Sequence, residues 1–149
     1  MFNFKDVEPQ SNEFKLLPMG EYVVAIVDAE IKESKKNSDN KYISATFEVV
    51  EGNYTRRKIF EMYNVINSNE TARRIAYSQI KSIMEAIKSN KTEFNTLEDI
   101  IAEISNKPMK CYVGIRKDEQ YGDKNVIKSY KPLTMGSGQD NINDGNIPF

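Results

Sequence analysis

The sequence predicts a mainly β protein in which five antiparallel strands form one unit, with helices inserted between the third and fourth strands. Three observations lead to this prediction. Residues 41–50 and 109–116 alternate apolar and polar side chains, as strands with one buried face do. Over residues 70–89 the spacing of apolar residues changes to that of a helix. The first three strands follow one another with short connections, which favours an antiparallel meander over alternating parallel βαβ units.

The first three strands are expected at residues 21–33, 41–50 and 57–65. The alternation is clearest in the second of them and weakest in the third. Polar, turn-forming residues separate the three. Residues 34–40 join the first strand to the second, and residues 51–53 (Glu-Gly-Asn) turn the second into the third.

A helix is expected over residues 70–89, and its apolar stripe is typical of a face packed on the core. That stripe consists of Ala72, Ile75, Ala76, Ile80, Ile83, Met84 and Ile87. Asn67 or Ser68 is the expected N-cap, with Glu70 placed to complete a capping box from Asn67.

A second helix is expected over residues 97–105, opened by Thr96. The last two strands follow at residues 109–116 and 125–131, joined by a polar turn over residues 118–124. The predicted order is therefore three strands, helices, and two strands.

This order is that of the OB-fold, a five-stranded barrel that binds oligonucleotides on strands 2–3 and through the loops joining strands 1–2 and 4–5. An SH3-like barrel and an open α+β sheet are the alternatives. We expect the OB-fold domain to span residues 1–132. Residues 133–149 hold three of the seven glycines and little apolar mass, so we expect a flexible acidic tail there.

Composition excludes several classes of function. The chain has no His, which removes His-dependent catalysis and His metal sites, and Cys111 is its single cysteine, which removes an intramolecular disulfide and multi-Cys metal sites. No cofactor or metal is expected. The longest apolar run, at residues 22–27, is far too short to span a membrane, and residues 1–6 do not resemble a signal peptide. We expect a cytoplasmic protein without enzymatic activity.

The net charge of −1 does not by itself favour nucleic acid, but its distribution does. Residues 105–131 are mostly basic and residues 83–104 mostly acidic. Basic residues gather in three places where an OB-fold contacts a strand: the first loop, the start of the third strand and the last loop. Aromatic residues lie among them, and cations with stacking rings are what sequence-tolerant single-strand binding requires.

We therefore identify a set of candidate DNA-binding residues. They are Lys35, Lys36, Lys41, Tyr42, Arg56, Arg57, Lys58, Phe60, Tyr112, Arg116, Lys117, Tyr121, Lys128 and Tyr130. For any single aromatic residue, packing inside the barrel is the competing role. Tyr63 is expected to point inward, whereas Tyr42 lies on the polar face of its strand.

The sequence ends in Asp-Gly-Asn-Ile-Pro-Phe, which resembles the tip of bacterial single-stranded DNA-binding proteins, where several aspartates precede Ile-Pro-Phe. The matching residues are Asp144, Ile147, Pro148 and Phe149, whereas glycine and asparagine replace acids at positions 145 and 146. The resemblance implies a protein-interaction tip that recruits replication or repair proteins. A carboxylate beside a Phe ring suits an apolar pocket with a basic rim.

The body of the chain resembles a phage-encoded family of small OB-fold single-stranded DNA-binding proteins. The resemblance rests on residues 4–9, 17–22, 47–52, 57–60, 113–123 and 130–132. It implies sequence-independent binding and protection of single-stranded DNA in bacteriophage DNA replication and recombination, in the cytoplasm of the bacterial host. The sequence leaves self-association open and predicts no membrane partner.

Three other functions compete with this one. Asp28, Glu30 and Lys32 alternate on the first strand, as in magnesium-dependent nucleases, but no second acidic motif accompanies them. A single-strand annealing or recombination-mediator protein would bind the same strands and then pair or load them. An interaction module without DNA binding is the last alternative.

Overall fold

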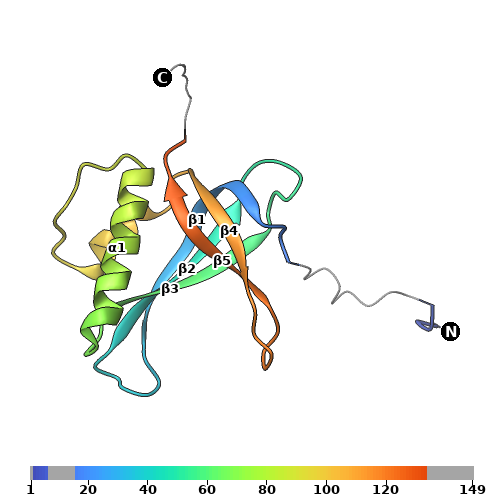
Figure 1. Cartoon of the computed structure of the whole chain (residues 1–149), viewed down its shortest axis with the longest axis horizontal. Helices are drawn as coiled ribbons and strands as arrows, with labels where there is room; N and C mark the ends of the chain where they lie inside the picture. Colours follow the sequence, from blue (N-terminus) through green and yellow to red (C-terminus); the bar gives the residue numbers. More distant parts are fainter. Residues whose placement is uncertain (1, 7–15, 134–149) are drawn as a thin grey trace.

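The computed structural model describes residues 2–6 and 16–133, and its elements follow the order expected from the sequence (Figure 1). The strands are β1 (Gly20–Glu33), β2 (Lys41–Val49), β3 (Lys58–Ile66), β4 (Met109–Arg116) and β5 (Lys124–Lys131), and the helices are α1 (Glu70–Ala86) and α2 (Leu97–Ile104). Most boundaries lie within one residue of the expected ranges, but α1 ends three residues early. Of the expected tail, residues 134–149 lie outside the described residues.

The strands form one antiparallel sheet in the order β3-β2-β1-β4-β5, which confirms the mainly β antiparallel prediction. The central strand β1 pairs with two other strands. Residues 20–24 pair with β4, and residues 24–33 pair with β2. A β-bulge between Ile26 and Asp28 interrupts the ladder with β2. Bulges bend a strand and increase its twist, so this one helps the sheet to curl.

Side chains join the two edge strands of this sheet, β3 and β5. The backbone N–H of Ile127 donates to Oε2 of Glu61 over 2.7 Å, and the hydroxyl oxygens of Tyr63 and Tyr130 share a hydrogen bond of 2.5 Å. Within the described residues the sheet has no backbone ladder between these two strands. We call this line of side-chain contact between β3 and β5 the seam.

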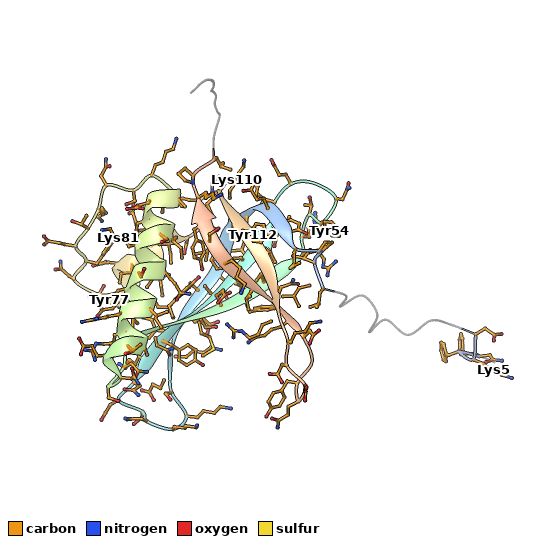
Figure 2. The ribbon with its side chains drawn as sticks, in the orientation of Figure 1. Lys5, Tyr54, Tyr77, Lys81, Lys110 and Tyr112 are labelled. Atoms are coloured by element: carbon orange, nitrogen blue, oxygen red, sulfur yellow. The ribbon has the colours of Figure 1, made fainter. Side chains whose placement is uncertain are left out.

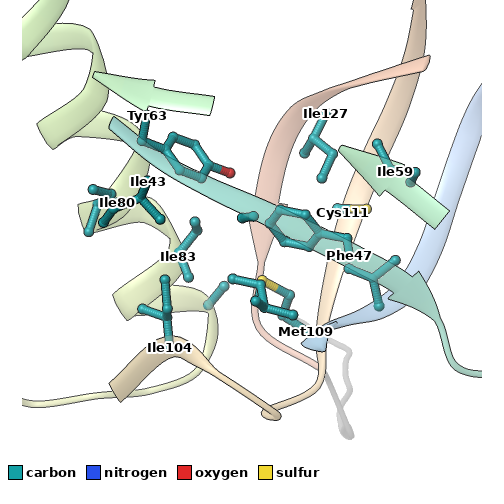
Figure 3. Packing of buried hydrophobic residues seen from close by; sticks show 14 of the residues in the cluster. Ile43, Phe47, Ile59, Tyr63, Ile80, Ile83, Ile104, Met109, Cys111 and Ile127 are labelled. Carbon is teal, nitrogen blue, oxygen red and sulfur yellow. The ribbon is translucent and has the colours of Figure 1, made fainter. Parts of the chain in front are cut away.

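The core fills the space between the sheet and α1 (Figure 3). Phe47, Ile83 and Met109 have no exposed surface, and burial of each such side chain contributes roughly 1.5–3 kcal/mol to stability. Tyr63 is equally buried, which confirms its expected inward orientation. Cys111 is buried among these residues, and burial raises the pKa of its thiol to about 12. Because the thiolate is the reactive form, this cysteine serves packing rather than chemistry.

Two expectations about α1 are wrong. Its N-cap is Asn69, whose side chain accepts the N–H of Ala72 over 3.0 Å, whereas the side chain of Asn67 accepts the N–H of Asn69. The apolar stripe also does not face the core throughout. Ala76, Ile80, Ile83, Met84 and Ala86 are buried, but the Ile75 side chain is 55% exposed.

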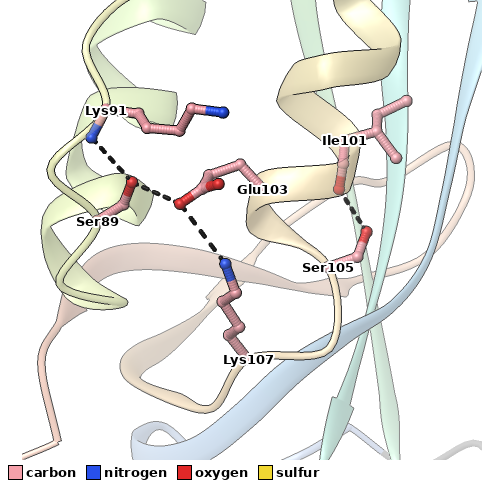
Figure 4. Close-up of polar contacts among 6 residues, drawn as sticks. All are labelled: Ser89, Lys91, Ile101, Glu103, Ser105 and Lys107. Carbon is pink, nitrogen blue, oxygen red and sulfur yellow. Dashed lines mark hydrogen bonds and ion pairs between the residues drawn. The ribbon is translucent and has the colours of Figure 1, made fainter.

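The segment between α1 and α2 is fastened to α2 by polar contacts (Figure 4). The Ser89 hydroxyl donates to Oε2 of Glu103 over 2.6 Å, and the Lys107 ammonium lies 3.5 Å from the same oxygen. The Ser89 hydrogen bond and the Lys107 charge lower the pKa of Glu103. Thr96 caps α2 by accepting the N–H of Asp99, as the sequence predicted. The contacts of Ser89 and Lys107 hold the α1–α2 connection and the segment that follows α2 against Glu103 of that helix.

Candidate nucleic-acid interface

A groove of about 960 Å³ follows the seam, between the outer side of β3, α1 and the start of β5. Its basic lining residues come from the β2–β3 connection, from the ends of β3 and β4, and from β5. They are Arg56, Arg57, Lys58, Arg116 and Lys124. Lys58, Arg116 and Lys124 form no ion pair with any carboxylate in the described part of the chain. Two carboxylates, Glu61 and Asp123, line the groove beside these five basic residues, so the lining keeps a net positive charge.

Strand alternation places apolar side chains in this groove. Along β3, Ile59, Tyr63 and Val65 point into the core, so the intervening Phe60 and Met62 point outward. The Phe60 side chain is 69% exposed and that of Met62 is 55% exposed. Exposed apolar side chains gathered beside a basic rim mark a surface that meets a ligand or a partner.

Arg56 holds an unusual backbone conformation at one end of the groove. Its φ angle is +78°, in the left-handed region that β-carbon-bearing residues rarely adopt. The conformation closes the β2–β3 connection: the Arg56 N–H donates to the Val49 carbonyl, and the Val49 N–H donates to the Arg57 carbonyl, each over 2.8 Å. A glycine would fit this position without strain. The chain instead carries an arginine there, and such strain is concentrated at functional sites.

One carboxylate, Glu61, lies where the groove meets the seam. Burial raises the pKa of Glu61 above its usual range, and the hydrogen bond from the Ile127 N–H and the charges of Arg116 and Lys124 oppose that shift. Its charge costs the folded state free energy and also reduces the positive potential of the groove.

Two loops project downward in the view of Figure 1, the β1–β2 connection at the lower left and the β4–β5 turn at the lower right. The β1–β2 connection carries exposed Lys35 and Lys36. The β4–β5 turn carries Tyr121, whose side chain is 81% exposed, and Lys117, which pairs with Asp123 over 3.1 Å. The Asp118 carboxylate accepts the N–H groups of residues 120 and 121, which lowers the pKa of Asp118 and fixes the turn.

The structure does not bring the remaining candidate residues into the groove. Tyr130 packs its ring 6.0 Å from that of Phe47 and bonds the Tyr63 hydroxyl, because it lies on the inward side of β5. Tyr112, 41% exposed, lies on the outer side of β4, opposite Glu21 (Figure 2). The remaining three, Lys41, Tyr42 and Lys128, are likewise absent from the groove lining.

The other three have identifiable positions. Lys128 is exposed on β5, and its stem covers Gly114, where a Cβ would lie 2.8 Å from the Lys128 Cε. Lys41 and Tyr42 begin β2 and are partly buried, Tyr42 lying opposite Lys32 of β1. These positions are typical of residues at a strand end or on the surface of a sheet.

Sequence reasoning missed part of the groove. Met62 shares the outward parity of Phe60, which could have identified it. Ile75 and Gln79 line the groove from α1, and Asn64 lines it from β3. Ile75 belongs to the apolar stripe that indicated core packing, and nothing in the sequence distinguishes it from its buried neighbours.

A second, smaller hollow of about 410 Å³ lies beside the β2–β3 connection. Tyr22 and Tyr54 line it, with their rings edge to face at 5.9 Å, together with Lys110, Glu21 and Glu51. The Tyr22 hydroxyl donates to the Pro18 carbonyl over 2.6 Å, and burial raises the pKa of Tyr22. We call this site the small hollow; Figure 2 labels Tyr54, Lys110 and Tyr112.

The described residues hold no group of three or more His, Cys, Asp or Glu placed to bind a metal ion. Asp28 and Glu30 are exposed on β1, without a further acid to complete such a site. Among the described residues, no helix combines the length and apolar character needed to cross a membrane.

No curated protein matches this chain. Residues 2–142, nearly the whole sequence, match a family model described as "Protein of unknown function (DUF669)". The chain therefore belongs to the DUF669 family.

Proposed function

We propose that this protein binds single-stranded DNA in the groove, without sequence preference and without catalysis. The observation that carries the proposal is the combination of basic and exposed apolar side chains along β3. Arg56, Arg57 and Lys58 would contact phosphates, and Phe60 would stack on bases. Cations that follow the backbone and rings that stack on bases are the two requirements for sequence-tolerant binding of single strands.

The proposed interface extends from the groove to the flanking loops. Arg116 and Lys124 line its β4–β5 side, with Lys117 and Tyr121 in the adjoining turn, and Lys35 and Lys36 lie in the β1–β2 connection. Tyr112, Lys128 and Tyr130 are left out of it because they lie on the outer side of β4, on β5 away from the groove, and against the core.

We further propose that the curled sheet is an OB-fold barrel. Two features support this assignment: the seam, which brings β3 and β5 together, and the insertion of α1 between β3 and β4. In an OB-fold the loops joining strands 1–2 and 4–5 flank the binding face. The basic β1–β2 connection and the β4–β5 turn occupy those two positions here.

The biological setting rests on the resemblance. We propose that the protein protects single-stranded DNA during phage replication and recombination, and that Asp144, Ile147, Pro148 and Phe149 recruit replication or repair proteins. These four residues lie outside the described residues. Deleting residues 147–149 should abolish capture of bacterial replication proteins and leave DNA affinity unchanged. Undiminished capture by the truncated protein would refute this role of the tip.

The test of DNA binding is a fluorescence-anisotropy titration of the full chain with single-stranded and duplex oligonucleotides at two salt concentrations. We expect preference for the single strand and a log–log salt slope of about −0.7 per phosphate neutralised. Equal or tighter binding of duplex, or affinity unaffected by salt, would refute the proposal. Strand cleavage in the same samples with magnesium present would instead support a nuclease.

A further inference from the structure

The α1 side of the groove differs from its basic end. Ala72, Ile75 and Gln79 line it from α1, and because they lie three to four residues apart they share one face of that helix. Ile75 is 55% exposed although it belongs to an otherwise buried stripe. Its exposed surface adjoins that of other apolar residues in the groove, so it belongs to a shared apolar lining rather than being an isolated exposed side chain.

Residues of β3 and β2 line the same groove as this helix. Met62 supplies an exposed apolar surface, and Asn64 and Ser44 supply polar groups. Asn64 and Gln79 are partly buried, and neither side-chain amide has a hydrogen-bond partner among the described residues. A partly buried amide without a partner is left with donor and acceptor capacity that a ligand can use.

The groove therefore changes in character along β3. Lys58 and its basic neighbours lie at one end and Asn64 at the other, a distance of roughly 20 Å along a strand of this length. A strand whose phosphates contact the basic end has unpaired bases free to turn toward α1. Duplex DNA keeps its bases paired and stacked, so the same turn would require base flipping.

We infer that the α1 side of the groove is a nucleobase pocket, in which Ile75 and Met62 contact the base faces and Gln79 and Asn64 bond the base edges. This inference rests on the proposed function. The Watson–Crick edge of every base places a hydrogen-bond donor beside an acceptor, and a side-chain amide can rotate to match either order. The pocket accordingly selects single strands over duplex while accepting any base.

The experiment distinguishes contacts with the bases from contacts with the phosphates. Anisotropy titrations of the full chain use a thymidine oligomer and an oligomer of equal length built from stable abasic (tetrahydrofuran) units, which keeps the phosphates and lacks the bases. The wild type should bind the thymidine oligomer more tightly. Ile75→Ala should weaken that binding by about fivefold, the cost of removing one part-buried apolar contact, and leave the abasic affinity unchanged.

A second variant tests the amide. Gln79→Met keeps the length of the side chain and removes its hydrogen-bonding groups, and it should weaken binding to thymidine, deoxycytidine and deoxyadenosine oligomers by about threefold each. Ser78→Ala, an exposed α1 position outside the groove lining, is the matched control and should change neither oligomer. Both sites are at least partly exposed, and thermal unfolding checks that the fold is retained.

The outcomes distinguish the two proposals. If the wild type binds neither oligomer, both the proposed function and the pocket are refuted. If it binds both oligomers equally, or if Ile75→Ala weakens both by the same factor, the groove recognises phosphates alone and only the pocket is refuted. A change in molecular mass on Ile75→Ala in sedimentation, without selective loss of base binding, would mark this surface as a contact between two copies of the chain and would also refute the pocket.

Discussion

The groove and the small hollow both combine aromatic and basic side chains beside the β2–β3 connection, yet they differ in their exposed aromatic surface and in their balance of charges. In the small hollow, the Tyr22 ring packs edge to face on Tyr54 and its hydroxyl donates to the Pro18 carbonyl. Lys110 forms no ion pair among the described residues, but two carboxylates, Glu21 and Glu51, line the same hollow. In the groove the Phe60 side chain is exposed, and Lys58 has no ion-pair partner among the described residues. The small hollow therefore has more carboxylates than basic residues, whereas the groove has five basic residues and two carboxylates, Glu61 and Asp123.

The largest expected effect comes from reversing the charge at the basic end of the groove. The combined change Arg56→Glu, Arg57→Glu and Lys58→Glu should weaken single-strand binding by about 100-fold or more at low salt, because several phosphate contacts become repulsive. The salt slope should become shallower. Lys110→Glu, at the small hollow, is the control and should change affinity by less than about threefold. Equal losses of affinity for the two variants would mean that the DNA strand contacts both the groove and the small hollow.

Two exposed aromatic residues on the outer face of the sheet, Phe60 of β3 and Tyr112 of β4, give the next comparison. Phe60→Ala should weaken single-strand binding by about tenfold, since a base–aromatic stack contributes roughly 1–3 kcal/mol. Tyr112→Ala removes an exposed ring outside the groove and should have little effect. Anisotropy titrations measure the DNA affinity of both variants. A larger loss of affinity for the Tyr112 variant would place the interface on the outer side of β4 instead.

Glu61 tests the electrostatics of the groove. Its folded-state pKa is raised, so its ionisation costs stability, and that cost develops as the pH rises from the usual carboxyl pKa through the folded-state pKa. Glu61→Gln keeps an oxygen for the Ile127 N–H. It should be more stable than the wild type at neutral pH and bind a single strand about fivefold more tightly.

The pH dependence provides the control for Glu61. Wild-type affinity should fall as Glu61 ionises, whereas the Gln variant should show a flatter profile over the same range. Thermal unfolding and anisotropy from pH 4 to pH 8 measure both quantities. Parallel profiles for the two proteins would contradict a role for this carboxylate.

The smallest expected effect concerns Arg56. Arg56→Gly relieves a left-handed backbone strain of roughly 1 kcal/mol, partly offset by the entropy of glycine in the unfolded chain, for a net gain of about 0.5 kcal/mol. The lost charge should weaken single-strand binding by about threefold. Arg56→Ala loses the same charge but keeps the strain, so it should show the affinity loss without the gain. Denaturant unfolding of the pair measures the difference, and identical stabilities would exclude stored strain.

The sequence predicted the order of the elements because periodicity reports burial directly. Alternation identified β2 and β4, and the change of period identified α1. Cap positions were harder, because Asn67, Ser68 and Asn69 all carry side chains that can cap. Only the three-dimensional structure shows that Asn69 reaches the N–H of Ala72.

The candidate site was predicted in part for the same physical reason. Arg56 to Phe60 follow one another along the chain, so a local pattern brings them to the groove. Tyr130 could not be assigned in this way, since its role depends on Phe47 and Tyr63 from distant strands. Ile75 lies on a helix whose apolar stripe is wider than the core it covers, and a helical period does not show where the core ends.

The seam also has a consequence for the order of folding. β1, β2 and β3 form a meander of chain neighbours, whereas the seam joins residues 66 and 67 positions apart and the β1–β4 ladder joins residues still farther apart, from Val24 with Met109 to Gly20 with Val113. Contacts between distant residues form only after the entropy of closing the intervening loop has been lost. We therefore expect the β1–β2–β3 meander to form early, and the β1–β4 ladder and the seam to form after it. The groove follows the seam, so a ligand held there would stabilise the closed sheet over the meander alone by mass action, and its binding would report that the seam has formed.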